Sequence, residues 1–145
     1  MNLEKTFPLK PFTIERGKIA EFVQAIGDSN PVYTDIETAR EEGFRDIPIP
    51  PTFPTVVEMW AGIDFETIIE ELDLNLLRVL HGEQSYEYLQ DVCAGDTISG
   101  VGYVTDVVDK KRLTIVKLQM DFFNQAEEKV LIGRSIVIET KEETE

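Results

Sequence analysis

The chain has 145 residues, enough for one domain with a buried core, and its 42% apolar and 29% charged residues argue against disorder. Its net charge of −14, from 28 acidic and 14 basic residues, repels phosphate backbones and argues against nucleic acid as a partner. No apolar run is long enough to span a membrane. With no secretory signal and one cysteine, Cys93, we expect a single cytoplasmic domain over 1–145 whose acidic end, 139–145, is frayed.

Up to about residue 75 the pattern is that of helices and loops. The first helix is predicted from near Ile14 to Ile26, with Thr13 as its N-cap and Gly27 at its end. Its apolar face follows the i, i+3, i+4, i+7 spacing of an amphipathic helix and consists of Ile19, Phe22, Val23 and Ile26.

Three more features follow before the pattern changes. A short helix over 36–42 is capped by Asp35. Prolines then stiffen the segment 48–54. A third helix begins near Thr52 to Thr55 and stops at Gly62, and we expect it to be largely buried because few polar side chains interrupt it. Residues 64–72 are compatible with a fourth, amphipathic helix.

From residue 76 onward the pattern is that of strands. They are predicted at 77–81, 84–89, 97–108, 113–124 and 130–138, with a bend at Gly100 and Gly102 and a hairpin turn at 109–112. Consecutive hairpins imply an antiparallel sheet. A sheet wrapped around a buried helix makes the predicted fold class α+β.

Several ordered motifs together resemble one family. The loop Gly27-Asp28-Ser29-Asn30-Pro31-Val32-Tyr33-Thr34-Asp35, followed by Ala39 and Gly43-Phe44, is similar to the signature of MaoC-like (R)-specific enoyl-CoA hydratases and 3-hydroxyacyl dehydratases. The segments 50–54, 80–88 and 94–96 resemble more specifically the N-terminal, dehydratase-like half of that superfamily. The resemblance implies a hot-dog fold, in which a curved antiparallel sheet wraps around one long central helix and pairs with a second hot dog.

The resemblance also implies candidate catalytic residues. In the family an Asp and a His five residues apart share the water that adds to an unsaturated thioester. Asp28 matches the acid and Asn30 the loop Asn, while Tyr33 stands where the His would be. Because a phenol has a reference pKa near 10 against about 6.5 for imidazole, Tyr33 is a poor base at pH 7 but a usable hydrogen-bond donor.

The candidate substrate-binding residues come from two other segments. Backbone N–H groups near the start of the central helix face the thioester carbonyl in the family. This resemblance points to Pro51, Thr52, Phe53 and Thr55, and the single histidine, His81, completes the set. No metal is expected, because no second His and no Cys or carboxylate stands at ligand spacing around His81. No cofactor is expected either, since an acyl-CoA or acyl carrier protein thioester is the implied substrate.

Plainer interpretations remain open for each of these residues. Asp28 and Asn30 are also typical of loop residues that satisfy turn amides, and Asp35 of a helix N-cap. Tyr33 is equally compatible with a pocket wall, and His81 with a structural or interface role. Glu58, on the third helix, stands where hot-dog thioesterases use a carboxylate, and the alternative is an interface Glu. The basic run 110–112 is compatible with coenzyme A phosphates or with a solvated turn.

Three functional hypotheses follow. The first is a hydratase/dehydratase-type protein acting on 3-hydroxyacyl and 2-enoyl thioesters, as a weakly active homodimer or as the pocket-forming partner of a His-bearing hot-dog subunit. The second is a non-catalytic acyl-binding module, and the third a thioesterase that uses Glu58. The acyl chain length, the carrier and the composition of the oligomer are not fixed by the sequence.

Overall fold

Five antiparallel strands form one sheet in the order β1-β3-β4-β5-β2 in the computed structural model, which describes residues 4–142. The strands are β1 (Thr6–Thr13), β2 (Val79–Tyr88), β3 (Thr97–Asp109), β4 (Leu113–Phe123) and β5 (Lys129–Thr140). β1 and β2 are therefore the two edges of the sheet, and β4 is its centre.

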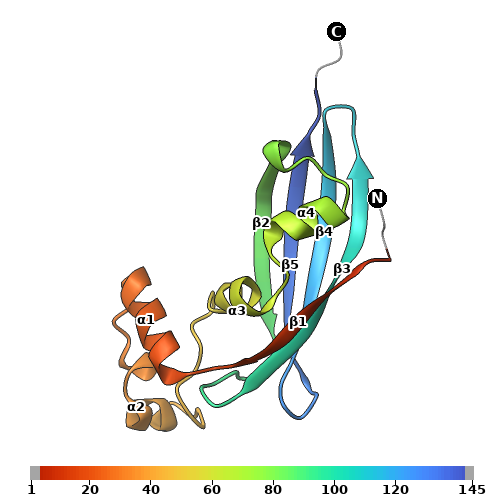
Figure 1. Cartoon of the computed structure of the whole chain (residues 1–145). Helices are drawn as coiled ribbons and strands as arrows, with labels where there is room; N and C mark the ends of the chain where they lie inside the picture. The colour runs from red at the N-terminus through yellow and green to blue at the C-terminus, as the bar shows by residue number, and fades with distance from the viewer. Residues whose placement is uncertain (1–3, 143–145) are drawn as a thin grey trace.

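The helices occupy two places (Figure 1). α1 (Arg16–Ile26) and α2 (Ile36–Glu41) lie together at one end of the sheet, whereas α3 (Pro54–Ala61) and α4 (Phe65–Glu71) lie against one face of it. Short 3₁₀ turns, η1 (Pro31–Tyr33) and η2 (Leu76–Arg78), complete the chain. The predicted α+β hot-dog arrangement is confirmed, but the central helix is two short helices separated at Gly62–Asp64 rather than one long one.

The helix ends are set by local chemistry, which the sequence predicts for Asp35 and Gly27 but not for the cap at Asp64. The Asp35 carboxylate accepts a hydrogen bond from the Glu37 amide at 3.2 Å and caps α2. Asp64 accepts from the Thr67 amide at 3.0 Å and caps α4. Gly27 ends α1 in the left-handed region, with φ of 73°. No helix within residues 4–142 is long and apolar enough to cross a membrane.

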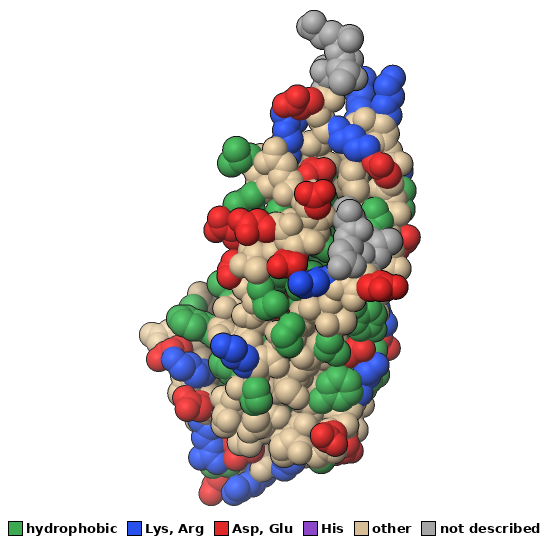
Figure 2. Space-filling view, turned by 45° about the vertical axis from the view of Figure 1, so that its right-hand side comes forward, with side chains coloured by type: hydrophobic (Ala, Val, Ile, Leu, Met, Phe, Trp, Pro, Cys, Tyr) green, Lys and Arg blue, Asp and Glu red, His purple; other side chains and the backbone are tan. Residues whose placement is uncertain are grey.

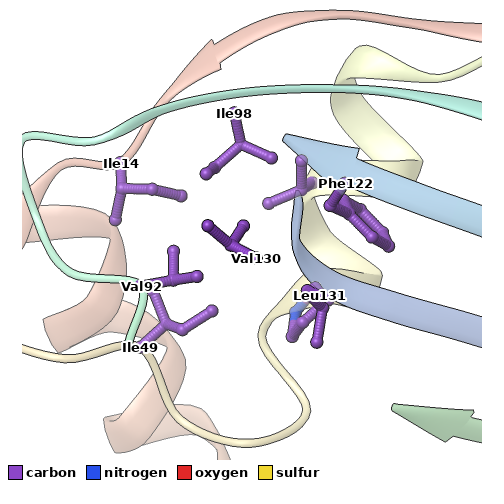
Figure 3. A pocket seen from close by; sticks show the side chains of 9 residues that line it. Ile14, Ile49, Val92, Ile98, Phe122, Val130 and Leu131 are labelled. Carbon is purple, nitrogen blue, oxygen red and sulfur yellow. The ribbon is translucent and has the colours of Figure 1, made fainter. Parts of the chain in front are cut away.

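The main core joins the sheet to the helices at its end. Phe53 and Phe122 are its largest fully buried side chains. A small apolar cavity of about 10 Å³ remains within it (Figure 3), lined by side chains that include Ile14, Ile49, Val92, Ile98, Phe122, Val130 and Leu131. A volume of this size, with no polar partner, holds no ligand.

The strand β1 is missing from the sequence prediction, which assigned only helices and loops to this half of the chain. Pro8 and Pro11 interrupt the segment, and proline is tolerated in a sheet mainly at an edge, where an amide donor is not needed. Phe7 and Leu9 are buried and alternate with exposed residues, which is the period of a half-buried strand. Thr13 is consequently the last residue of β1 and not a helix cap; α1 begins at Arg16 after Glu15.

Two strand predictions are also corrected. The segments 77–81 and 84–89 are not separate strands but one strand, β2, with a bulge between His81 and Glu83. The predicted bend at Gly100 and Gly102 needs a smaller correction: the β1–β3 register shifts between Leu9 and Phe12, next to Gly100, but the β3–β4 register shifts further along, between Val104 and Asp106. A bulge inserts one unpaired residue without ending the strand, so β2 continues through it.

Burial departs from expectation at α3 and at the end of the chain. α3 is not largely buried, because Met59 is 75% and Trp60 79% exposed. The predicted frayed end, 139–145, begins too early: Glu139 and Thr140 belong to β5, and the Glu139 carboxylate accepts from the Asn75 amide at 2.6 Å. Residues 143–145 of that prediction lie outside the described part of the chain.

Candidate functional site

The loop between α1 and α2 holds its three acidic and amide side chains in turns. One oxygen of Asp28 accepts from the Asn30 amide at 2.9 Å, and the Asn30 side chain accepts from the Val32 amide at 3.1 Å. With Asp35 capping α2, each of these side chains shapes the backbone. Asp28 is exposed, so its other oxygen faces solvent.

Tyr33 is half-buried in the same loop and packs against the main core. Burial raises the pKa of its phenol, and the negative charge of Asp28 raises this pKa further. Both effects hold the hydroxyl in its protonated form at neutral pH. The structure thus shows Tyr33 as a packing residue whose phenol stays protonated, which is unsuited to the role of a base.

The proline segment before α3 leaves few free amide donors. The Phe53 amide donates to the Pro50 carbonyl at 3.0 Å and the Thr55 amide to the Thr52 carbonyl at 3.2 Å, while Pro54 has no N–H. Phe53 is fully buried and packs edge-to-face on Phe22, with ring centroids 5.5 Å apart. Pro51 and Thr52 are exposed, so the predicted binding segment is divided between core and surface.

A cavity of about 780 Å³ lies between the α3–α4 pair and the sheet. The interruption of the central helix at Gly62–Asp64 borders it on one side. On the sheet side it is bordered by small residues, Gly102, Gly133 and Ser135, and by Met120 and Leu118. A volume of this size is in the range of small-molecule pockets. Of the predicted site residues, Thr55 and His81 line this cavity.

Glu58, on α3, is the group with the most altered acidity among the cavity-lining residues. Burial raises the pKa of its carboxyl to about 7, although a hydrogen bond from Tyr86 partly opposes this rise. The Tyr86 hydroxyl donates to Oε2 of Glu58 at 3.1 Å and lies 2.9 Å from the Thr55 hydroxyl oxygen. Burial likewise raises the pKa of Tyr86. The sequence marked Glu58 only by its position on the helix; its partner Tyr86 was not foreseen.

His81 lies on β2 at the border of the cavity. Its ring centroid is 5.0 Å from that of Phe65 on α4, with the planes tilted by 34°. No group of three or more His, Cys, Asp or Glu side chains in the 4–142 range is arranged to hold a metal ion. The geometry of His81 is thus that of a ring stacked at the cavity border.

A buried carboxylate that the sequence did not reveal ties the helical end to the sheet. Asp96, 1% exposed, accepts two hydrogen bonds from the Arg45 guanidinium, at 2.7 and 2.6 Å, and one from the Cys93 amide at 3.0 Å. Burial alone would raise the pKa of Asp96, but these bonds lower it overall. The only signal in the sequence was that Asp96 closes the 94–96 motif.

The basic run Lys110 to Arg112 forms the turn between β3 and β4. Figure 1 shows this turn at the opposite end of the sheet from α1 and α2, and Figure 2 shows basic side chains gathered at that end. Its position separates it from the loop that holds Asp28 and Tyr33.

Comparison with known proteins places this geometry in a family. A family model described as "FAS1-like, dehydratase domain region" matches residues 5–132. A UPF0336 protein of Thermobifida fusca is 33% identical over 129 residues, which cover 89% of this chain and 84% of that protein. A UPF0336 protein of Streptomyces coelicolor is 33% identical over 126 residues, covering 86% of this chain and 82% of that protein.

Solved structures share the fold. The truncated HadBC (3R-hydroxyacyl-ACP dehydratase) complex of Mycobacterium tuberculosis superposes with a TM-score of 0.82 at 18% identity, over 95% of this chain and 98% of that one. The ChsH1-ChsH2 complex of the same organism gives 0.76 at 24% identity, over 92% and 89%. The (R)-hydratase of A. caviae gives 0.72 at 18%, over 94% and 96%. The chain belongs to the FAS1-like dehydratase domain family and shares its fold with these hydratase and dehydratase structures.

Proposed function

We propose that this chain is the pocket-forming subunit of a hydratase/dehydratase that acts on 3-hydroxyacyl and 2-enoyl thioesters. The observation that carries the proposal is the cavity of about 780 Å³ beneath the interrupted central helix. An acyl chain is the apolar part of such a thioester, and a cavity bordered by Ile68, Leu118 and Met120 suits it.

The chemistry of the loop supports a division of labour. Hydration adds a hydroxyl to the β carbon of the enoyl thioester and a proton to its α carbon, so it needs a base for water and dipoles for the carbonyl oxygen. Asp28 can position water, but Tyr33 stays protonated. The amides of Phe53 and Thr55 already donate within their own turns. In this proposal the base belongs to a partner subunit, and a homodimer of this chain is at most weakly active.

The β2 edge is where we place that partner. Leu80 on β2 is 63% exposed and Leu77, in the η2 turn just before it, is 93% exposed, while Met59 and Trp60 lie uncovered on α3. An edge strand offers unpaired backbone groups, and exposed apolar side chains beside it favour association. HadBC and ChsH1-ChsH2 are named as complexes, in agreement with a hot-dog partner. The proposed partner is a hot dog that bears the Asp/His pair.

A direct assay tests the proposal. Hydration of crotonyl-CoA and of trans-2-decenoyl-CoA is measured with the purified chain alone and after coexpression with a His-bearing hot-dog subunit from the same source. We expect little turnover alone and at least a hundred-fold more in the complex, mainly on the longer substrate. Full activity of the chain alone, abolished by Asp28→Asn, would instead establish an autonomous site.

A second candidate function is thioester hydrolysis. It is favoured by Glu58, a carboxyl of pKa about 7 at the cavity wall that could activate water. Because few amides at the start of α3 are free, the thioester carbonyl oxygen would have few hydrogen-bond donors during hydrolysis. We therefore rank hydrolysis second. If the wild-type chain releases free thiol from decanoyl-CoA and Glu58→Gln does not, thioester hydrolysis becomes the favoured function.

A further inference from the structure

A chain of hydrogen bonds leads to a carboxylate inside the larger cavity. The Tyr86 hydroxyl donates to Oε2 of Glu58, so the Thr55 hydroxyl, 2.9 Å away, is left to donate to the Tyr86 oxygen. The two hydroxyl dipoles therefore point the same way, toward the carboxylate. Such an alignment stabilises an acceptor at its end.

The other carboxylate oxygen, Oε1, has no hydrogen bond from the described residues and is not sealed inside the protein. None of the hydrogen bonds found for Glu58 involves Oε1. Yet no buried side-chain nitrogen or oxygen within residues 4–142 lacks a partner, so Oε1 is not sealed in the protein. Since Glu58 lines the cavity, we take this oxygen to be the acceptor that a ligand in the cavity meets.

The position of Tyr86 depends on a glycine of the neighbouring strand. Gly133 on β5 is the register partner of Tyr86, and a Cβ atom there would lie 3.1 Å from the Tyr86 ring and 3.3 Å from that of Phe122. The ring of Tyr86 thus lies close over the glycine backbone, with its hydroxyl held at Glu58. Gln84 and Ser135, the register pair two positions along the same strands, also line the cavity. With Glu58 and Thr55 they form a polar strip on its wall.

This strip changes which ligand the cavity favours. A plain alkyl chain that fills the space would strip water from Glu58 and leave an ionised carboxylate with one partner only. A ligand hydroxyl placed at Oε1 would restore the lost hydrogen bond. Sites built to bond a hydroxyl reject analogues that lack it, because their own polar groups are then left unpaired.

We propose that the cavity selects acyl groups that carry a hydroxyl along the chain, remote from the thioester, with Glu58 as its acceptor and Tyr86 and Thr55 as positioning residues. The inference rests on the proposed acyl-binding function and narrows its substrate class. It concerns the tail of the acyl group and not the carbon atoms where water is added.

Binding of matched probes tests the inference. The dissociation constants of decanoyl-CoA and of 6-, 8- and 10-hydroxydecanoyl-CoA are measured by calorimetry with the full chain at pH 8, above the pKa of Glu58 of about 7. At least one hydroxylated probe should bind at least ten-fold more tightly than decanoyl-CoA. Decanoyl-CoA binding as tightly as all three would overturn the inference and leave the acyl pocket standing. No binding of any probe would overturn both.

Two variants sharpen the result. Glu58→Met keeps the length of the side chain but removes the acceptor, so it should abolish the preference and tighten the binding of decanoyl-CoA. Glu87→Gln is the matched control: Glu87 neighbours Tyr86 on β2 but pairs with Arg134 through an exposed ion pair outside the cavity. It should keep the wild-type preference. A preference that survives Glu58→Met contradicts the assignment, provided thermal unfolding shows that the variant is folded.

Discussion

Asp96, directly before β3, accepts one hydrogen bond from each terminal guanidinium nitrogen of Arg45, which follows α2, at 2.7 and 2.6 Å. The same carboxylate accepts from the Gln125 side chain in the β4–β5 turn at 3.1 Å. One buried group thus joins the helical end of the molecule to two parts of the sheet. It holds the segment that follows α2 against the sheet.

Replacing Asp96 should therefore destabilise the whole domain. In Asp96→Ala the Arg45 guanidinium and the Cys93 amide lose their acceptor. Because half of the Arg45 side chain remains solvated, we expect a loss of about 2–3 kcal/mol rather than the full cost of a broken buried pair. Thermal unfolding should show a Tm lower by roughly 6–12 °C. Glu87→Gln, which loses only an exposed pair, serves as the control and should change stability by less than about 1 kcal/mol. Equal effects of the two substitutions would contradict the role of Asp96 in joining the helical end to the sheet.

Glu58 should make the stability of the protein fall as pH rises. Its pKa is raised from 4.5 to about 7, so the folded state holds a proton that the unfolded state has released between these values. The stability is highest below pH 4.5 with respect to this group, and it is lost as pH rises through 7, by about 3 kcal/mol at most. The other titratable groups at the cavity are Asp64, His81, Glu83 and Tyr103, together with Tyr86, which is bonded to Glu58.

Denaturant unfolding of Glu58→Gln against the wild type isolates this contribution. The difference in unfolding free energy should grow in favour of the variant between pH 4.5 and 7.5 and stay constant above that. Contributions from Asp64, His81, Glu83, Tyr86 and Tyr103 are common to both proteins and largely cancel. A difference that does not change with pH would mean that Glu58 ionises normally.

How much of the site was predictable depends on the range of the interaction. Asp35, Asp64 and Gly27 act on backbone groups within three residues, and their helices were predicted close to where they lie. β1 was missed because its strand geometry comes from pairing with β3, about ninety residues away, while its two prolines locally disfavour a strand. The sequence pattern therefore predicts a helix or strand correctly where interactions within a few residues determine it, and fails where distant pairing does.

The candidate site divides in the same way. The loop residues Asp28, Asn30 and Tyr33 were found because their spacing is a motif within one segment. The environment of Glu58 depends on Tyr86, 28 residues further along the chain, and that of Asp96 on Arg45, 51 residues earlier. Neither pairing has a signature in the sequence, because both arise from how the sheet and helices pack.

In the assembled enzyme the loop residues should matter little for the chemical step. Tyr33→Phe and Asp28→Asn should each change kcat for enoyl-CoA hydration by less than about three-fold, since general acid–base groups contribute about 10²–10⁴-fold and these are not proposed to act as such. Replacing the histidine of the partner subunit should abolish turnover. A hundred-fold loss in Asp28→Asn would show that this loop carries the base after all.

The exposed apolar residues beside the β2 edge should control assembly. Trp60→Glu and Leu80→Glu each introduce a charge where side chains 79% and 63% exposed are proposed to become buried. Interfaces of standard size bury about 1,600 Å² in total, and an aromatic anchor contributes strongly to them. Each variant should weaken the complex at least ten-fold, measured by light scattering or native mass spectrometry over a dilution series. Gln24→Glu, which adds the same charge on the exposed side of α1, should leave it intact. If neither Trp60→Glu nor Leu80→Glu weakens the complex, the interface does not lie at the β2 edge. The proposal of a partner-supplied base would then lose its main support.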